Sequence, residues 1–232
     1  MSAAAEAASA RELWVFGYGS LMWRPGFAYE EARHARLTGY RRCFCIFSVH
    51  HRGTPQRPGV VLGLDRGGSC EGIAFRVAAA RAAATKRYLR EREQVYGVYR
   101  HVYAPVALTE GPRRQVVALT YVAERAHPNY ARLPASALAR LIRGGKGASG
   151  ANLDYFVNTL RHLAELGIRE RALERLLVLV GPHARHLAGG TGISAGAAAR
   201  IRAARSTAAP VRELGRGGRS PFLYRLRADG SA

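Results

Sequence analysis

The stretch LWVFGYGS, residues 13–20, decides how the start of this chain is interpreted. Residues 13–16 are a run of large apolar side chains typical of a short buried strand, and residues 17–20 form a glycine-rich turn signal. Glycines let successive backbone N–H groups converge on one point, which makes a nest for an anion such as a carboxylate. We expect Gly19 to use a positive φ there. Because most strands that end in a glycine turn are purely structural, the function has to be argued from other segments as well.

Working outward from this stretch, segments rich in Val, Ile, Tyr and Phe recur between Gly and Pro turns. Helical patterns follow, with Pro134 in the first turn of one helix and Ser149 or Asn152 as the cap of the next. Runs of strands followed by runs of helices indicate an α+β domain with a mixed or antiparallel sheet that could close into a barrel. The predicted strands cover about 36–49, 59–65, 70–78, 98–107 and 114–123, and the predicted helices cover 78–93, 134–144, 152–167 and 169–180.

The composition is that of a globular protein. The chain has 232 residues, of which 48% are hydrophobic and 22% charged, so one core of ordinary size is expected. There is no apolar run of roughly 18 residues to span a membrane, and the alanine-rich N-terminus does not resemble a secretory signal, so we expect a cytoplasmic protein. The three cysteines, Cys43, Cys45 and Cys70, suit neither a disulfide framework nor paired zinc spacing and are interpreted as core residues.

The excess of basic residues indicates that the protein interacts with an anionic partner or substrate. The chain has 36 basic and 16 acidic residues, a net charge of +20. Nucleic acid is the first candidate for such a chain. However, the arginines are scattered, and the sequence contains no helix-turn-helix, zinc finger or RNA-binding aromatic pair. Nucleic acid is therefore not the expected partner, because a positive field would equally concentrate a small anionic substrate.

Glu93 stands out because of helical spacing. An apolar stripe at three- and four-residue steps is formed by Ala78, Ala82, Thr85 and Leu89, and Glu93 is its next member. A carboxylate at the inward edge of a core is costly unless it is paired, so its position hints at function. The open alternative is that the helix ends at Arg92 and leaves Glu93 in a loop.

Two other groups of polar residues receive a structural interpretation. Glu91 falls beside Arg87 and Arg90, where a solvated ion pair is expected. His50 and His51 lack a third ligand at a usual zinc spacing, and adjacent residues on a strand face opposite ways. We expect neither a metal nor another cofactor.

A series of short motifs then follows in a fixed order. They are WVFGYGSLMWRPGF (14–27), GYRRCF (39–44), HRGTPQRPGVVLGL (51–64), CEGIAFRV (70–77), YLREREQ (88–94), GVY (97–99), HPNYARLP (127–134) and GASGANLDYF (147–156). Together these motifs resemble the ChaC-like family of glutathione-specific γ-glutamylcyclotransferases. Chance does not provide so many unrelated motifs in one order, and the resemblance extends over about residues 14–180.

The resemblance implies both a fold and a reaction. The implied fold is a small mixed β-barrel flanked by helices, and the implied reaction cleaves the substrate glutathione to 5-oxoproline and Cys-Gly. The implied catalytic residue is Glu93, which the helical stripe also singles out. Tyr99 and Tyr130 fall where related enzymes have tyrosines near the substrate. The substrate loop falls on Gly17, Tyr18, Gly19, Ser20, Leu21 and Met22.

Three segments and two alternatives complete the prediction. Residues 1–12 are expected to be a mobile tail, residues 13–187 the γ-glutamylcyclotransferase domain, and residues 188–232 a flexible Gly/Ala/Arg-rich extension. One alternative is a cyclotransferase for other γ-glutamyl amides, since the same turn and glutamate would serve them. The other is a non-catalytic, basic nucleic-acid-binding protein on the same fold.

Overall fold

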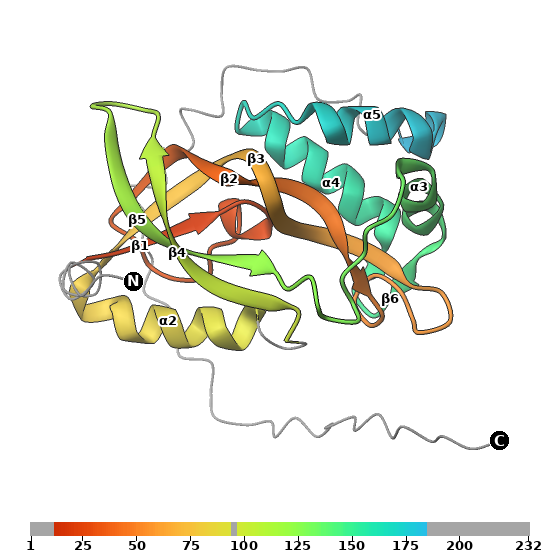
Figure 1. The fold of residues 1–232 in the computed structure, drawn as a ribbon, viewed down its shortest axis with the longest axis horizontal. Coiled ribbons are helices and arrows are strands. Elements are labelled where there is room, and N and C mark those ends of the chain that lie inside the picture. Colours follow the sequence, from red (N-terminus) through yellow and green to blue (C-terminus); the bar gives the residue numbers. More distant parts are fainter. Residues whose placement is uncertain (1–11, 94–96, 185–232) are drawn as a thin grey trace.

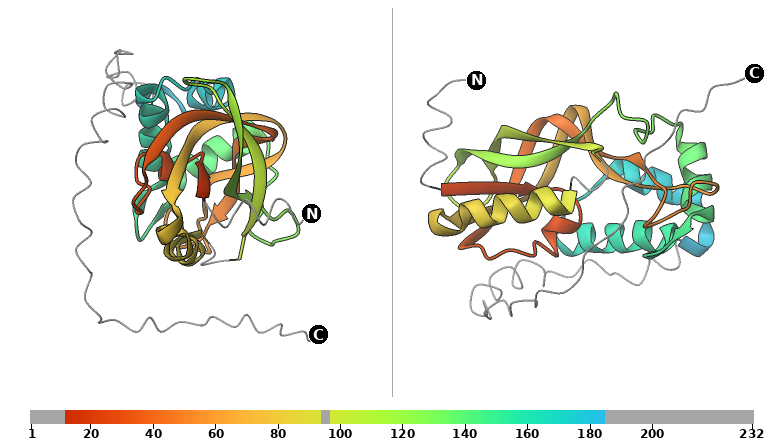
Figure 2. Two further views of the ribbon diagram at one scale, coloured as in Figure 1. Left: turned by 90° about the vertical axis from the view of Figure 1, so that its left-hand side faces the viewer. Right: turned by 90° about the horizontal axis from the view of Figure 1, so that it is seen from below.

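A computed structural model describes residues 12–93 and 97–184 of the chain. These residues form a closed barrel with one helix along one side and three helices on the opposite side (Figures 1 and 2). The expectations of an N-terminal tail before residue 13 and of an extension over residues 188–232 fall almost wholly outside the described residues.

Five strands close the barrel in the order β1-β3-β2-β4-β5. Strands β1 and β5 pair in parallel and close it, whereas the other neighbouring pairs are antiparallel. This arrangement confirms the predicted α+β fold with a small mixed barrel. The strands are β1 (Glu12–Gly17), β2 (Glu31–Ser48), β3 (Gly59–Ala78), β4 (Tyr99–Leu108) and β5 (Arg114–Ala123).

The prediction of two separate strands at 59–65 and 70–78 is wrong, because β3 runs through both. Gly67 and Gly68 have φ angles of 94° and 76°, so this local signal does resemble a turn. The neighbouring strand β2 has a matching irregularity at Gly39, with a φ of 90°, where the register shifts between Thr38 and Tyr40. Because both strands bend at the same place, the ladder continues, and such a bulge gives the curvature that a closed barrel needs.

The four predicted helices are present with ends shifted by at most two residues. Helix α2 lies against β1 and β3, and the other three helices pack together, with α3 and α4 contacting β3 (Figure 1). No helix within 12–93 and 97–184 is long and apolar enough to cross a membrane. The helical elements are η1 (Ser20–Met22), α2 (Ala79–Glu93), α3 (Ala135–Gly144), α4 (Asn152–Glu165) and α5 (Arg171–Val180), and a two-stranded sheet of β6 (Lys146–Gly147) and β7 (Gly150–Ala151) precedes α4.

The start of α4 differs from the predicted cap. Ala151 is the residue at the N-cap position, and no side chain caps the helix. The Asn152 side chain instead accepts a hydrogen bond from Val60 N at 2.7 Å and donates one to Val60 O at 2.8 Å. A fully buried amide needs such partners, so Asn152 is used to fix α4 on β3 rather than to cap the helix.

Candidate active site

Glu93 is the last residue of α2, and its side chain continues the inward face of that helix. Thr85 and Leu89 on the same stripe are buried, and the Glu93 side chain is only 17% exposed. Burial raises the pKa of Glu93 above its ordinary value, and the positive charge of Arg92 opposes part of that shift. The structure therefore places a largely desolvated carboxyl group at the end of a helix, whereas Glu91 is exposed.

The turn after β1 continues into the short helix η1. Met22 N donates to Gly19 O at 2.9 Å, which closes the helical turn. No described residue accepts a hydrogen bond from the backbone N–H groups of Ser20 and Leu21, as expected for the first residues of a helix. The expectation of a positive φ at Gly19 is wrong, because the φ angle of Gly19 is −134°. The free donors thus come from the start of η1, not from a left-handed glycine.

These two features meet in one cavity of about 80 Å³, which we call the turn-side cavity. Glu93 approaches it from α2, and the turn approaches it from the end of β1. Aromatic and aliphatic side chains of the barrel and of α4 complete the wall. The lining residues are Tyr18, Gly19, Ser20, Leu21, Val61, Leu62, Glu93, Tyr99, Tyr121 and Tyr155.

Two tyrosines in this wall share one backbone partner. Tyr99 Oη donates to Leu62 O at 2.7 Å, and Leu62 N donates to Tyr155 Oη at 3.4 Å. Burial raises the pKa of Tyr99 well above its ordinary value and raises the pKa of Tyr155 to about 12. Both hydroxyls therefore stay neutral at physiological pH. Among the residues that the structure describes, Glu93 is the only carboxylate in the lining of the turn-side cavity.

Arg92 connects Glu93 with the turn. Its Nε lies 3.3 Å from Glu93 Oε1, and its Nη2 donates to Ser20 Oγ at 2.9 Å. Its Nη1 donates to Arg24 O at 2.8 Å and to Tyr88 Oη at 2.9 Å. A planar guanidinium with several directed donors can hold these groups at once, so Arg92 fixes the end of α2 against the turn after β1.

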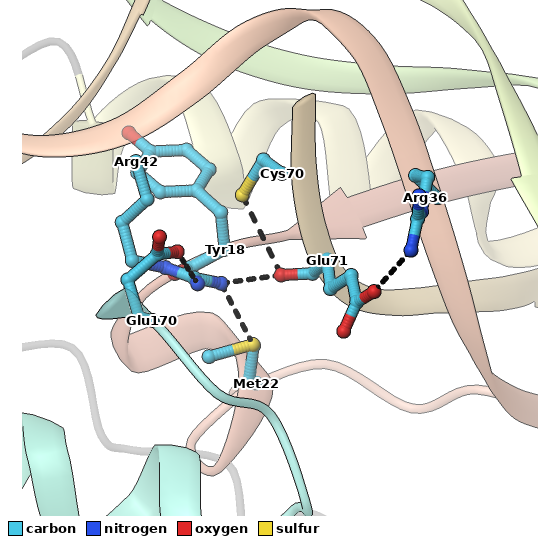
Figure 3. A network of polar contacts seen from close by, with 7 residues as sticks. All are labelled: Tyr18, Met22, Arg36, Arg42, Cys70, Glu71 and Glu170. Carbon is cyan, nitrogen blue, oxygen red and sulfur yellow. Dashed lines mark hydrogen bonds and ion pairs between the residues drawn. The ribbon is translucent and has the colours of Figure 1, made fainter. Parts of the chain in front are cut away.

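A second arginine, Arg42, binds the turn through contacts of its own (Figure 3). Its side chain is fully buried in β2, and its Nε donates to Tyr18 O at 2.6 Å. Nη1 pairs with Glu170 Oε2 at 2.8 Å, and Nη2 donates to Glu71 O while lying 3.8 Å from Met22 Sδ. A buried charge needs such a complete set of partners. Arg42 thereby ties the turn to β3 and to the residue before α5.

A second cavity of about 160 Å³ also borders Glu93, and we call it the loop-side cavity. It shares Val61, Glu93 and Tyr99 with the turn-side cavity. Its remaining wall comes from the end of β2, the segment after it and the segments that flank β4 and β5. The described residues of its lining are Ile46, Phe47, Ser48, Val49, His51, Val61, Arg92, Glu93, Val98, Tyr99 and Asn129.

Some expected site residues do not line either cavity. Gly17 is paired with Ile73 in the sheet, and Met22 is buried beside Arg42. Tyr130 forms a β-bridge with Ile46 but is absent from both walls, so a substrate contact by Tyr130 has no support in the geometry.

Sequence reasoning also missed several residues of the site. Tyr155 and Arg92 stand inside the quoted motifs 147–156 and 88–94, but no spacing distinguishes them from their neighbours. Among residues 12–93 and 97–184, no three His, Cys, Asp or Glu side chains are arranged to hold a metal ion. The expectation that no metal is needed stays a prediction.

Comparisons with known proteins give a consistent result. The family described as "ChaC-like protein" matches residues 13–183. The glutathione-specific γ-glutamylcyclotransferase of Escherichia coli (strain K12) is 34% identical over 169 residues, 72% of this chain and 72% of the relative. The glutathione-specific γ-glutamylcyclotransferase 1 of Homo sapiens is 38% identical over 148 residues, 62% of this chain and 67% of the relative.

A solved structure shares the fold. A crystal structure of a γ-glutamyl cyclotransferase specific to glutathione from yeast superposes with a TM-score of 0.65. It covers 73% of this chain and 96% of the yeast chain, at 22% sequence identity. At that identity the structural similarity supports only the fold, a barrel with flanking helices. The family assignment rests on the family match and the sequence relatives.

Proposed function

The chain belongs to the ChaC-like protein family, and from this premise we propose that it cleaves glutathione to 5-oxoproline and Cys-Gly, with Glu93 as general acid/base. One observation carries the mechanism: Glu93 and the free N–H groups at the start of η1 line the same cavity. The first group can move a proton, and the second can bind an oxygen anion.

The reaction needs few parts, because both reacting groups belong to the same γ-glutamyl unit. The α-amine attacks the γ-carbonyl, a five-membered lactam closes, and the bond to the cysteinyl nitrogen breaks. Neither water nor an external nucleophile is consumed. Holding such groups in a folded-back conformer corresponds to effective molarities of about 10⁵ M and above. The narrow turn-side cavity suits this task.

Glu93 is proposed to move the proton. The substrate amine is an ammonium at neutral pH and cannot attack until it loses a proton. The Glu93 carboxylate accepts that proton and then returns it to the leaving cysteinyl nitrogen, a role worth about 10²–10⁴-fold in rate. Burial raises the pKa of Glu93 toward that task, because a weakly basic carboxylate would accept the proton poorly.

The backbone donors of the turn are proposed to orient the γ-glutamyl unit. The N–H groups of Ser20 and Leu21 can bind the α-carboxylate of the glutamyl group or the oxyanion that forms at the γ-carbon. Arg42 and Arg92 support this turn from two sides, so the donors are held before the substrate arrives. Both possible roles of the turn stay open.

The function is tested by product analysis. The purified chain is incubated with glutathione in buffer that contains EDTA, and 5-oxoproline and Cys-Gly are measured by mass spectrometry. We expect both products in equal amounts. Failure to form 5-oxoproline would refute the proposal, and activity that appears only when a divalent ion is added would refute its metal-free mechanism. A panel of other γ-glutamyl amides tests the alternative of a broader substrate range, which no observation in the site supports.

A cytoplasmic location stays a prediction of the sequence.

A further inference from the structure

The two cavities meet at Glu93, where the bond that breaks must lie. Glu93, Tyr99 and Val61 belong to both walls, so a molecule bound at Glu93 has room on either side. If the γ-glutamyl unit occupies the turn-side cavity, then the part beyond the scissile bond has to extend into the loop-side cavity. The loop-side cavity is the larger of the two, with about 160 Å³ against about 80 Å³, and a two-residue group is larger than a single glutamyl unit.

We propose that the loop-side cavity is the subsite for the departing Cys-Gly dipeptide, and that His51 at its rim recognises the glycine carboxylate. This inference rests on the proposed function. The inner wall contains Ile46 and Val98, which are 3% and 1% exposed and can contact the cysteinyl side chain. The Cys-Gly group has its cysteinyl side chain near the scissile bond and its carboxylate at the far end. It would therefore suit a cavity that is apolar at its inner wall and polar at its rim.

The rim of the cavity carries polar and cationic groups. His51 is exposed to solvent, and its Nδ1 lies 3.0 Å from Ser149 Oγ, which restricts how the ring can turn. The next residue, Arg52, is not part of the cavity lining, but it carries a permanent positive charge beside His51, and its guanidinium lies over the Tyr155 ring at 5.2 Å. Asn129 also lines the cavity, and its backbone is fixed by a hydrogen bond of 2.8 Å from Phe47 N to Asn129 O. A carboxylate bound next to His51 would therefore lie close to hydrogen-bond donors and to the positive charge of Arg52.

The ring of His51 is suited to act as a donor without being charged. Burial and the neighbouring His50 and Arg52 lower the pKa of His51, so the ring is mainly neutral at physiological pH. A neutral imidazole still has one N–H group to donate. His50 packs edge-on against His51, with ring centroids 5.0 Å apart, but does not line the cavity, which makes it a matched control.

The test compares three substrates in the unmodified chain and in two variants. The substrates are glutathione, glutathione with its glycine carboxylate converted to an amide, and γ-glutamylcysteine, which lacks the glycine. The variants are His51→Phe, which keeps a ring but has no hydrogen-bond donor, and the control His50→Phe. Hydrogen bonds to charged groups are strong enough to change affinity about tenfold. We therefore expect kcat/KM of the unmodified chain to be about tenfold higher for glutathione than for the other two.

The variants separate recognition of the carboxylate from general damage. His51→Phe should lower kcat/KM for glutathione about tenfold, mainly through KM, and change it less than about twofold for the amide. His50→Phe should leave all three substrates unchanged. Equal kcat/KM for glutathione and its amide in the unmodified chain, or an equal loss for both in His51→Phe, would overturn the assignment. Absence of 5-oxoproline from every substrate would instead remove the proposed function, and this subsite with it.

Discussion

At the scale of single residues, Glu93 and Glu91 offer a direct comparison, because they lie two positions apart on one helix and differ in exposure. Glu93→Gln keeps the size of the side chain but removes the basic oxygen. We expect kcat for 5-oxoproline formation to fall about 10²–10⁴-fold, with a smaller change in KM. Glu91→Gln is the control and should change activity less than about twofold, because its side chain is exposed. If Glu91→Gln lost activity and Glu93→Gln did not, Glu91 rather than Glu93 would be the general acid/base.

Arg92 should set the pH range of the reaction. Glu93 must be ionised to accept a proton, so activity falls as the pH drops through its pKa. Arg92 lowers that pKa against the effect of burial, and its removal in Arg92→Gln should raise it further. The acid limb of the pH dependence of kcat/KM, which reports the free enzyme, should then move to higher pH.

The matched control for this prediction is Ser20→Ala. It removes the contact from Arg92 Nη2 but leaves the ion pair with Glu93 intact. Its acid limb should stay where it is in the unmodified chain, whatever happens to the rate. An acid limb that does not move in Arg92→Gln would mean that Arg92 only holds the structure together.

At the scale of elements, Arg42 links β2 to three other parts of the fold, whereas its neighbour Arg41 does not. Arg42→Lys keeps the charge but cannot place donors on Tyr18 O, Glu71 O and Glu170 at once. We expect the free energy of unfolding to fall by about 2–3 kcal/mol, since charge-assisted hydrogen bonds to buried groups are lost. Arg41 is half exposed and pairs with Asp65, so Arg41→Lys should cost less than about 1 kcal/mol in urea unfolding. If the free energy of unfolding fell equally in the two variants, Arg42 would not anchor the turn more strongly than Arg41 anchors its own neighbours.

The contrast between these two arginines also shows where prediction from sequence ends. Successive side chains of a strand face opposite ways, so one of Arg41 and Arg42 had to face inward, but the sequence does not say which. The stripe of α2 was easier, because Thr85 and Leu89, the buried residues of the helix, set the phase that Glu93 continues. Gly67 and Gly68 gave a turn signal that the matching bend of β2 overrides. Local patterns thus predicted helices and the catalytic candidate, whereas contacts such as that of Tyr155 with Leu62 depend on pairing between distant segments.

At the scale of the whole molecule, the described part of the site comes from residues before 156. Among residues 12–93 and 97–184, none in either cavity wall lies beyond Tyr155, and the family match ends at residue 183. Removing the residues after Leu187 should therefore leave kcat for glutathione within about twofold of the full chain. Steady-state kinetics on the truncated chain check this. A truncated chain that unfolds at the same temperature but has lost turnover would require the extension to contribute to the site.

The net charge of +20 should act on the substrate from a distance. Glutathione has one more carboxylate than ammonium, so a positive field raises its concentration near the protein. Salt shortens the reach of that field, from about 30 Å at 0.01 M to about 3 Å at 1 M ionic strength. We expect kcat/KM for glutathione to fall about three- to tenfold over this range while kcat stays nearly constant, because the field acts on capture and not on the bound complex.

Two controls separate this field from local effects of salt. The glycine amide of glutathione has no net charge, so its kcat/KM should stay nearly constant over the same range. The chain that lacks residues 188–232 loses eight arginines and two acidic residues, which lowers the net charge by 8 − 2 = 6 to +14. Its salt dependence with glutathione should be weaker than that of the full chain but still present, because most of the positive charge lies before residue 188. If salt lowered kcat/KM equally for glutathione and for its amide, the effect would have to come from the binding contacts themselves, and the positive charge of this chain would need another explanation.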